Sequence, residues 1–380
     1  MKGTRVFVMI ISFIIFTAAD DPAYGFAHSA GGYLKNMQAF SFTDADSEWS
    51  MFNAWNLRLN ARLFPSDNLT LVFGGNTFFI YSGSVVNITG QEKSGYYTRS
   101  DPGELSAGYI SDSFTAGVFS DRMYFEFNKN IFSFSGGYQR INWGMNTVWN
   151  PNDIFNAYSI YDIDYEERPG ILSLRARIFT GPASGFDIAA APGEKYGILY
   201  RFNLKGRDIQ LLCGYGGDDL IAAAGFESEL FTAGIKGEYT HFYDTDSKTD
   251  GHIAAFNIIH TLKNGTGITA GFIHNSYGME KNAFMNRTAP SSDDPVKSLS
   301  AGRYGAFWQL SHPFTPLLYG STAAVMNLSD MSLYISPQLI YSMFEDLELL
   351  LAAQLYTGKG LDEFPNTLGR SVFIRLKYSF

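Results

Sequence analysis

One short stretch of the chain carries residues that could act together in catalysis. In GFIHNSYG, residues 271–278, His274 stands two positions before Ser276. Side chains two positions apart project from the same face of a strand, so the imidazole would lie beside the hydroxyl. An imidazole base next to a serine is the first requirement of a nucleophilic site. His274 and Ser276 are therefore the candidate for covalent catalysis.

The rest of such a site is not evident in the sequence. A third residue must orient the imidazole, and Asn282 and Asn286 are nearby. The H-x-S-x-G order resembles that of the outer-membrane phospholipase, a smaller barrel that hydrolyses lipid, but neither asparagine has the spacing of that enzyme. Polar side chains are common where a segment leaves a bilayer. We therefore expect His274 and Ser276 to be interfacial residues and the protein not to be an enzyme.

Signals for cofactors, metals and nucleic acid are absent from the sequence. Cys213 is the single cysteine, which excludes an internal disulfide and a C-x-x-C-H haem site. The histidines have no metal-ligand spacing, and neither G-x-G-x-x-G nor a P-loop occurs. The net charge of −9 argues against nucleic acid as a partner. We predict no cofactor, no metal and no nucleic-acid partner.

Arginines recur at alternate positions opposite apolar residues. In WNLRLNARL, residues 55–63, apolar side chains fall on one face of a strand and polar side chains on the other. The apolar face would be core in a soluble sandwich, whereas in a membrane barrel it meets lipid and the polar face lines a water-filled lumen. We predict a lumen wall that contains Arg58, Arg62, Arg175, Arg177, Arg201, Arg303 and Arg375.

A long polar and aromatic segment interrupts this alternation. It reads YQRINWGMNTVWNPNDIFN over residues 138–156, and the acidic YDIDYEERPG follows at 161–170. The Asn-Pro pair forces an extended residue and then favours a short helical turn in DIFNAYSI, residues 153–160.

We predict that residues 143–169 fold inward as a constriction loop. An acidic loop opposite an arginine-rich wall sets up a transverse field that selects polar solutes. The alternative is an extracellular cap whose tryptophans belong to an interfacial belt. The predicted constriction residues are Trp143, Trp149, Asn150, Asp153, Asp162, Asp164, Glu166 and Glu167.

The N-terminus predicts export. Lys2 and Arg5 precede an apolar run over residues 6–16, and small residues between 18 and 27 offer cleavage. The run is too short to span a bilayer stably. We predict a signal peptide in residues 1–27 and one mature domain in residues 28–380.

Composition indicates an unusual outer surface for that domain. No later segment has the apolar length of a transmembrane helix. Aromatic content is 16%, and only 17% of residues are charged, against about 25% in typical soluble domains. This balance suits a protein whose outer face meets something other than water.

The C-terminal strand supports the same interpretation. SVFIRLKYSF, residues 371–380, alternates apolar and polar positions and ends in Tyr378 and Phe380. It resembles the C-terminal signature that bacterial outer-membrane barrels present to the barrel-assembly machinery. We predict that Tyr378 and Phe380 form the assembly signal.

The connections between strands fall into two alternating classes. Short turns, including those predicted at residues 228–229 and 313–315, alternate with longer polar connections. This pattern predicts an all-β, closed, transmembrane antiparallel β-barrel of about 18 strands, with 16 as the alternative.

The middle of the chain also resembles a known group of proteins. Arg140, Asn142, Trp143 and Gly144 are followed by Asn150-Pro151 with Asp153, and then by YEERPG. This order resembles the signature of a poorly characterised family of porin-like outer-membrane barrels of Gram-negative bacteria. The resemblance implies an outer-membrane location and a channel.

The sequence therefore favours an outer-membrane porin-like channel for passive or selective diffusion of small polar solutes. The alternatives are a barrel without transport, serving as an adhesin or a surface-assembly scaffold, and a lipid hydrolase using His274 and Ser276. The expected partners are outer-membrane lipid, lipopolysaccharide, the barrel-assembly machinery and small polar solutes. A monomer and a trimer are both compatible with the sequence.

Overall fold

The computed structural model describes residues 27–43, 49–82, 95–97, 106–111, 113–157, 170–193, 195–288 and 294–380. Its elements are β1 (Ala27–Phe42), β2 (Ser50–Ser66), β3 (Leu69–Ser82), β4 (Gly95–Tyr97), β5 (Ser106–Ile110), β6 (Phe114–Lys129), β7 (Phe132–Gln139), β8 (Ile171–Gly181), β9 (Ser184–Ala191), β10 (Lys195–Leu204), β11 (Arg207–Gly216), β12 (Asp219–Leu230), β13 (Ala233–Asp244), β14 (Thr249–Thr261), β15 (Gly267–Asn275), α2 (Ala283–Thr288), β16 (Tyr304–Thr315), β17 (Leu318–Asn327), β18 (Leu333–Phe344), β19 (Leu347–Tyr356), η2 (Asn366–Leu368) and β20 (Arg370–Ser379). The predicted signal peptide lies outside the described residues except for Ala27, and stays a prediction.

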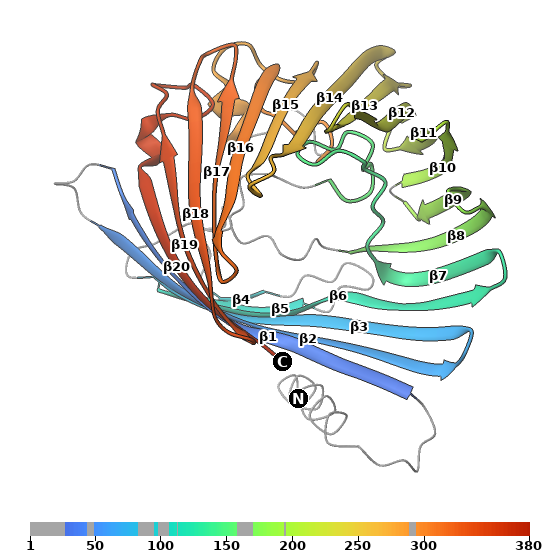
Figure 1. The fold of residues 1–380 in the computed structure, drawn as a ribbon, viewed down its shortest axis with the longest axis horizontal. Helices are drawn as coiled ribbons and strands as arrows, with labels where there is room; N and C mark the ends of the chain where they lie inside the picture. The colour runs from blue at the N-terminus through green and yellow to red at the C-terminus, as the bar shows by residue number, and fades with distance from the viewer. Residues whose placement is uncertain are drawn as a thin grey trace.

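The strands close into a ring, as Figure 1 shows in a view down the barrel. Neighbours in the sequence pair antiparallel, β3 pairs with β6, and β1 pairs with both β2 and β20. In the described part of the chain, 18 strands form this ring, which confirms the predicted closed barrel. β5 pairs with β6, and the short β4 pairs with β5, outside the ring. Closure satisfies the hydrogen bonds that an open edge would leave unpaired.

The seam between the first and last strands requires a glycine. The backbone N–H of Gly32 donates to the Phe380 carbonyl at 2.8 Å, and the Phe380 N–H donates to the Gly32 carbonyl at 3.0 Å. A Cβ at position 32 would lie 2.1 Å from the carbonyl oxygen of Arg58. Any side chain there would push β1 away from β2, so glycine allows the seam to close.

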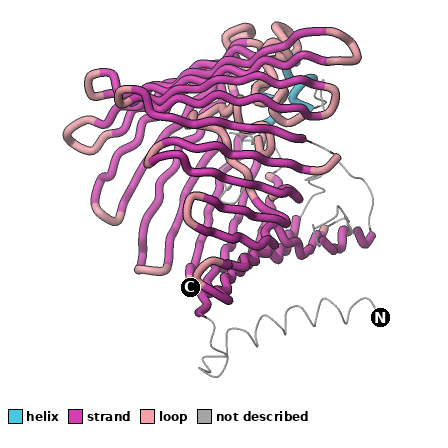
Figure 2. Tube along the Cα trace, turned by 90° about the vertical axis from the view of Figure 1, so that its right-hand side faces the viewer, coloured by secondary structure: helices cyan, strands magenta, loops and turns pink. Residues whose placement is uncertain are grey.

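The two ends of the barrel differ in their connections. Short turns, such as residues 67–68, 130–131 and 205–206, define the short-turn end, and the longer connections define the opposite end (Figure 2). Two predicted turns were misplaced: β12 runs on to Leu230, so the turn is at 231–232, and β16 runs on to Thr315, so the turn is at 316–317. In the first of these turns, Phe231 adopts φ 57°.

The outward face of the ring is apolar. In β20, Val372, Ile374 and Leu376 are 39%, 38% and 43% exposed, whereas Phe373 and Arg375, in the opposite phase, are 8% and 6% exposed. Exposed Trp, Phe, Leu, Ile and Tyr side chains recur in this phase on the other strands. In the part of the chain that the structure describes, no helix has the length and apolar character needed to cross a membrane.

The inward face is not polar throughout. From β10 to β15 it carries buried apolar side chains, among them Leu199, Phe242, Ile253 and Ile273, each 0% exposed. These residues form one cluster with Trp143 and Trp149 from the interrupting segment. One side of the barrel interior is therefore a packed core.

Candidate functional site

The interrupting segment lies inside the ring as far as residue 157 (Figure 1). Trp143 and Trp149 are both 0% exposed and pack on the inner wall. A Cβ on Gly197 of β10 would lie 2.7 Å from the Trp143 ring, so the missing side chain makes room for the indole. Trp149 meets Phe307 of β16 edge to face, with ring centroids 6.3 Å apart. The segment thus spans the inner wall from β10 to β16.

Glu238 of β13 attaches the segment to the wall through its backbone. One carboxylate oxygen accepts the N–H groups of Met145 and Asn146, the latter at 2.7 Å, and the other accepts the N–H of Asn152 at 2.9 Å. The side chain of Asn152 also accepts a hydrogen bond from Thr240 Oγ1 at 2.7 Å and donates to the Ala224 carbonyl at 3.1 Å. Three backbone N–H groups converge on this one carboxyl group, so Glu238 is the central anchor of the segment.

Side chains within the segment fix its own fold. Asp153 Oδ1 accepts the N–H of Trp143 at 3.1 Å, and Asn156 Oδ1 accepts the N–H of Ile141 at 2.8 Å. Asn150 packs against Gly144, where a Cβ would lie 2.4 Å from the Asn150 amide oxygen. The expected helical turn is not formed in residues 153–157, whose Asp153 and Asn156 side chains instead bind the backbone of residues 141–143.

The acidic residues of the segment are only partly described. Asp153 is 0% exposed and accepts the N–H of Trp143, and its predicted place opposite the arginines stays a prediction. Asp162, Asp164, Glu166 and Glu167 lie outside the described residues. The opposition of an acidic loop and an arginine wall stays a prediction.

A second connection, residues 276–303, packs on the same core. Val296 and Leu299 are 1% and 5% exposed and belong to the cluster that contains Trp143 and Trp149. Lys195 Nζ donates to the Ile154 carbonyl at 2.6 Å and pairs with Asp294 at 2.8 Å, so it ties both insertions to β10. The sequence predicts a long connection at residues 277–301 but gave no signal that it packs on the core.

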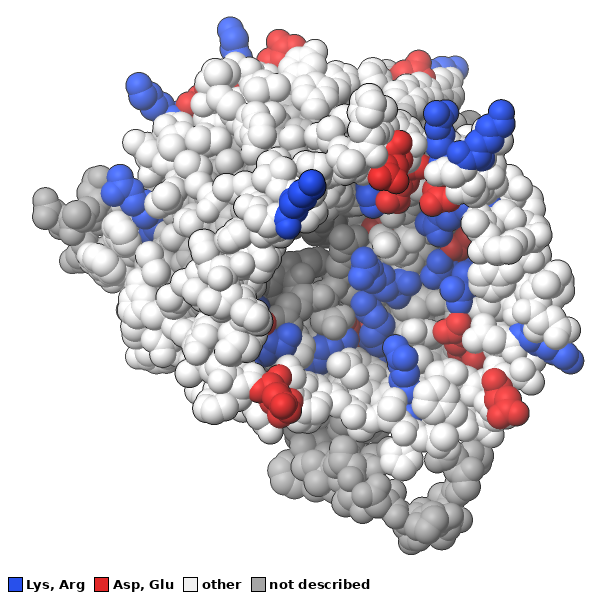
Figure 3. Space-filling view, in the orientation of Figure 1, with Lys and Arg blue, Asp and Glu red and all other residues white. Residues whose placement is uncertain are grey.

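The opposite part of the inner wall is cationic. Figure 3 shows Lys and Arg side chains gathered beside the opening of the barrel, with acidic side chains between them. Within the described strands from β2 to β10, six arginines stand with three carboxylates. They are Arg58, Arg62, Arg122, Arg175, Arg177 and Arg201, with Asp121, Glu126 and Asp187.

Ion pairs hold most of these arginines against the wall. Arg175 pairs with Asp187 at 2.5 Å, and Arg177 pairs with Glu126 at 2.7 Å. Arg201 donates to Gln210 Oε1 and to the Trp143 carbonyl, both at 3.4 Å, so it joins the wall to the inserted segment. The cationic side chains are therefore held in position beside the opening.

A β-bulge directs one carboxylate into this array. The register between β3 and β6 shifts at Gly74 and Gly75, which leaves Asp121 without a partner in β3. Asp121 lies 3.1 Å from Arg58 and 3.4 Å from Arg122. Bulges re-aim side chains in this way. Arg122 and Asp121 were not predicted, because the bulge breaks the alternation on which the prediction rested.

Two predicted wall arginines have other environments. Arg303 precedes β16 and pairs with Glu280 at 2.6 Å in the 276–303 connection, so it does not belong to the strand wall as expected. Arg375 of β20 is 6% exposed and pairs with Glu348. Near it, the Nζ atoms of Lys35 and Lys377 lie 5.4 and 4.8 Å from the centre of the Tyr33 ring, which adds two cations that the sequence analysis did not single out.

His274 and Ser276 are not arranged as a catalytic pair. Ser276 Oγ accepts the backbone N–H of His252 at 2.8 Å. The His274 ring lies between His252 and Tyr304, with centroid distances of 4.9 and 5.1 Å. Within the described contacts, no hydrogen bond joins His274 to Ser276. Among the residues described, no group of three or more His, Cys, Asp or Glu side chains is placed to hold a metal.

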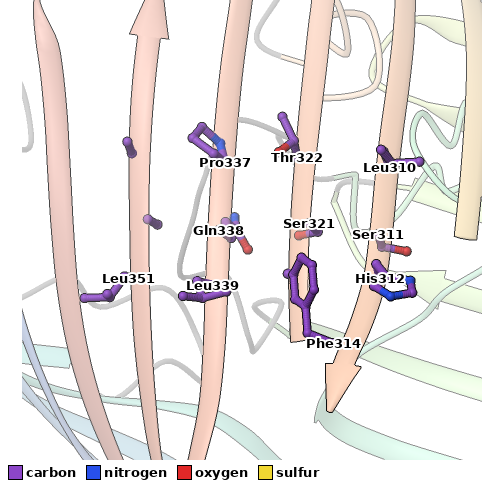
Figure 4. Close-up of a pocket in the computed structure, with 13 residues that line it drawn as sticks. Leu310, Ser311, His312, Phe314, Ser321, Thr322, Pro337, Gln338, Leu339 and Leu351 are labelled. Atoms are coloured by element: carbon purple, nitrogen blue, oxygen red, sulfur yellow. The ribbon is translucent and has the colours of Figure 1, made fainter. Parts of the chain in front are cut away.

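A groove of about 470 Å³ lies on the outward face between β16 and β19 (Figure 4). Leu310, Thr322 and Pro337 occupy paired positions across three strands of this groove. Proline lacks an N–H, and the ladder between β18 and β19 has a gap there. The groove belongs to the apolar outer surface and not to the interior.

The terminal aromatic residues lie at the seam. Tyr378 and Phe380 are 49% and 55% exposed, and their rings are 6.3 Å apart. Their predicted role as an assembly signal is not tested by this placement.

The fold is that of a porin-type barrel, and solved structures of similar architecture cover nearly the whole chain. Over 93% of this chain, OccAB3 of Acinetobacter baumannii matches with a TM-score of 0.58, 11% identity and 99% of its own length. OccK8 (OprE) of Pseudomonas aeruginosa matches over the same share with a TM-score of 0.55, 9% identity and 98% of its length. OpdK of Pseudomonas aeruginosa, solved with vanillate, matches with a TM-score of 0.51, 10% identity and 98% of its length. These identities establish a shared fold. No protein-family model and no curated protein matches the sequence.

Proposed function

We propose that the protein is an outer-membrane channel for passive or selective diffusion of small polar solutes. The observation that carries this proposal is the cationic inner wall, where the described strands from β2 to β10 carry six arginines and three carboxylates. Charged side chains lining a narrow path are the usual basis of charge selectivity. An excess of positive charge favours the passage of anions.

The outer surface supports a membrane location. Exposed apolar side chains surround the ring, as in Leu351 of β19 and Ile374 of β20, which are 41% and 38% exposed. A belt of this kind suits hydrocarbon, and a closed ring leaves no unpaired strand edge in lipid. We further propose that a cleaved signal peptide exports the chain in a Gram-negative bacterium, with the short turns facing the periplasm. Outer-membrane lipid, lipopolysaccharide and the assembly machinery would be its partners.

The inserted segment is proposed as the constriction. Its backbone is bound by Glu238, and its tryptophans pack on one side of the interior, which leaves the arginine side for solutes. The resemblance of residues 131–180 to a porin-like family agrees with this role and remains a prediction. We propose no catalytic role for His274 and Ser276.

The test is conductance in planar lipid bilayers. Purified protein should give stable open steps, and a potassium chloride gradient should give a reversal potential of the sign expected for anion preference. Deleting residues 145–165 should increase the unit conductance severalfold. Absence of open steps at all voltages would instead favour a barrel without transport, such as an adhesin or a scaffold.

A further inference from the structure

The 276–303 connection reaches strands far from its own, at the end of the barrel opposite the short turns. It leaves β15 and returns to β16. Between these strands, Lys297 pairs with Asp219, the first residue of β12, at 2.7 Å. Asp294 pairs with Lys195, the first residue of β10, at 2.8 Å. The connection therefore crosses from β15 to the ends of β12 and β10.

The two ion pairs run in opposite directions between the connection and the wall. At β10 the wall supplies the cation, and at β12 it supplies the carboxylate. The four side chains are 8–14% exposed, and a charge at such a depth is costly once its partner is removed. The Nζ of Lys297 also lies 4.9 Å from the centre of the Tyr277 ring and 5.5 Å from that of Phe242. These contacts fix residues 294–297 against the wall.

Lys195 contacts the connection and the inserted segment with the same atom. Its Nζ lies 2.8 Å from Asp294 Oδ1 and donates to the Ile154 carbonyl at 2.6 Å. Asp294 Oδ1 also accepts the N–H of Val296 at 3.0 Å, and Val296 belongs to the apolar cluster that includes the segment. A lysine ammonium group that loses a nearby carboxylate extends toward water. Displacing the connection would therefore release the hydrogen bond to Ile154.

We propose that Lys195 is a positioning residue through which the 276–303 connection holds the inserted segment in its docked place. Coupling between two docking equilibria is reciprocal, so each insertion stabilises the other. An agent that pulls the connection away from β10 and β12 then loosens the segment as well. This inference rests on the proposed channel function only where it concerns conductance, because the docking itself is measured on the protein without any current.

The experiment measures how fast an impermeant thiol reagent reaches the inserted segment in the detergent-solubilised protein. Cys213, the single cysteine, is replaced by serine, and Val148→Cys supplies a reporter thiol at a position that is 4% exposed. Asp219→Asn is the decisive variant, because no hydrogen bond or ion pair described here joins Asp219 to the segment. It should make the reporter react about tenfold faster, the effect of losing one hydrogen bond to a charged group.

Two controls separate this coupling from a general loss of stability. Glu280→Gln changes the same charge in the same connection, but Glu280 pairs with Arg303 and its side chain is 59% exposed, so the rate should not change. A second reporter, placed by Leu350→Cys in the separate apolar cluster of β19, should keep its rate in every variant.

Lys195→Met tests the link itself. It should make the Val148→Cys reporter react about tenfold faster, since it removes the donor to Ile154. Adding Asp219→Asn to Lys195→Met should raise the rate by less than the product of the two single effects, because both changes act through one contact. In planar bilayers, Asp219→Asn should give a larger or more variable unit conductance than the wild type.

The possible results are distinguishable. Equal reporter rates in Asp219→Asn and Glu280→Gln, or equal acceleration of both reporters, overturn the coupling while the channel stands. Fully multiplicative effects of Asp219→Asn and Lys195→Met overturn Lys195 as the link. Absence of open steps in bilayers, with the expected reporter rates, overturns the channel and leaves the coupling. Should Lys195→Met fail to fold, Asp219→Asn and its two controls decide the coupling by themselves.

Discussion

Glu238→Gln should release the inserted segment from the barrel wall. In the native protein the carboxylate accepts the N–H groups of Met145, Asn146 and Asn152. Glutamine has nearly the same shape, but its amide oxygen can serve only one side of this arrangement, and its NH2 group would face an N–H donor. The substitution therefore replaces at least one of the three hydrogen bonds by a repulsive contact and leaves a buried N–H donor without an acceptor.

The size of the effect follows from these three bonds. A hydrogen bond to a charged group contributes about 1.5–3 kcal/mol, and a neutral one about 0.5–1.5 kcal/mol. Leaving one buried N–H donor without an acceptor costs about 1–3 kcal/mol, which changes the docked-to-undocked ratio by roughly five- to a hundredfold. Glu238 is only 4% exposed, so solvent screening reduces this figure little.

Single-channel recording and limited proteolysis together measure the release. The variant should show a larger or more variable unit conductance and faster cleavage within residues 141–157 than the wild type. Glu227→Gln is the matched control, because Glu227 pairs with Lys236 on the neighbouring strand at 3.1 Å and its side chain is 43% exposed. Wild-type conductance and wild-type protease resistance in Glu238→Gln would refute the view that this carboxylate anchors the segment.

Three further predictions concern the wall, the packing and the seam. Replacing Arg175 and Arg177 by glutamine removes two positive charges from the inner wall, so the reversal potential in a salt gradient should move toward cation preference. An unchanged potential would remove these residues from the conducting path. Gly197→Ala should displace Trp143, because the added Cβ would lie 2.7 Å from the indole. The free energy of unfolding, measured in a denaturant titration, should fall by about 1–3 kcal/mol. Equal stability of the variant and the wild type would mean that the indole shifts freely. Phe380→Ser should reduce the yield of folded barrel in the outer membrane, measured by heat-modifiable gel migration, and an undiminished yield would argue against its role in assembly.

The closed barrel could be predicted from the sequence because alternation is a local property. Successive side chains of a strand point to opposite faces, so the zigzag of β20 identifies its outward residues without knowledge of its neighbours. Turn composition is also a local property and marks where one strand ends and the next begins, which is why the predicted number of strands agrees with the number in the ring. The two misplaced turns show the limit of that reasoning, since a strand can continue through residues that favour turns when its partner continues beside it.

The arrangement of side chains in the barrel interior depends on contacts between residues far apart in the sequence. Glu238 and Asn152 are 86 positions apart, and a carboxylate in a strand looks the same in the sequence whether it faces water or binds a loop. Asp121 contacts the arginines because a bulge in β6 changes the alternation of inward and outward side chains. Sequence analysis assumes that this alternation is constant along a strand.

The sequence by itself therefore determined the number of strands, their outward faces and the presence of many arginines on the other face. Only the tertiary structure decided which part of the interior is packed and which part is left to charged side chains. The physical reason is that a strand's periodicity fixes the direction of each side chain relative to the sheet, whereas closure of the sheet and insertion of a loop determine what that side chain meets.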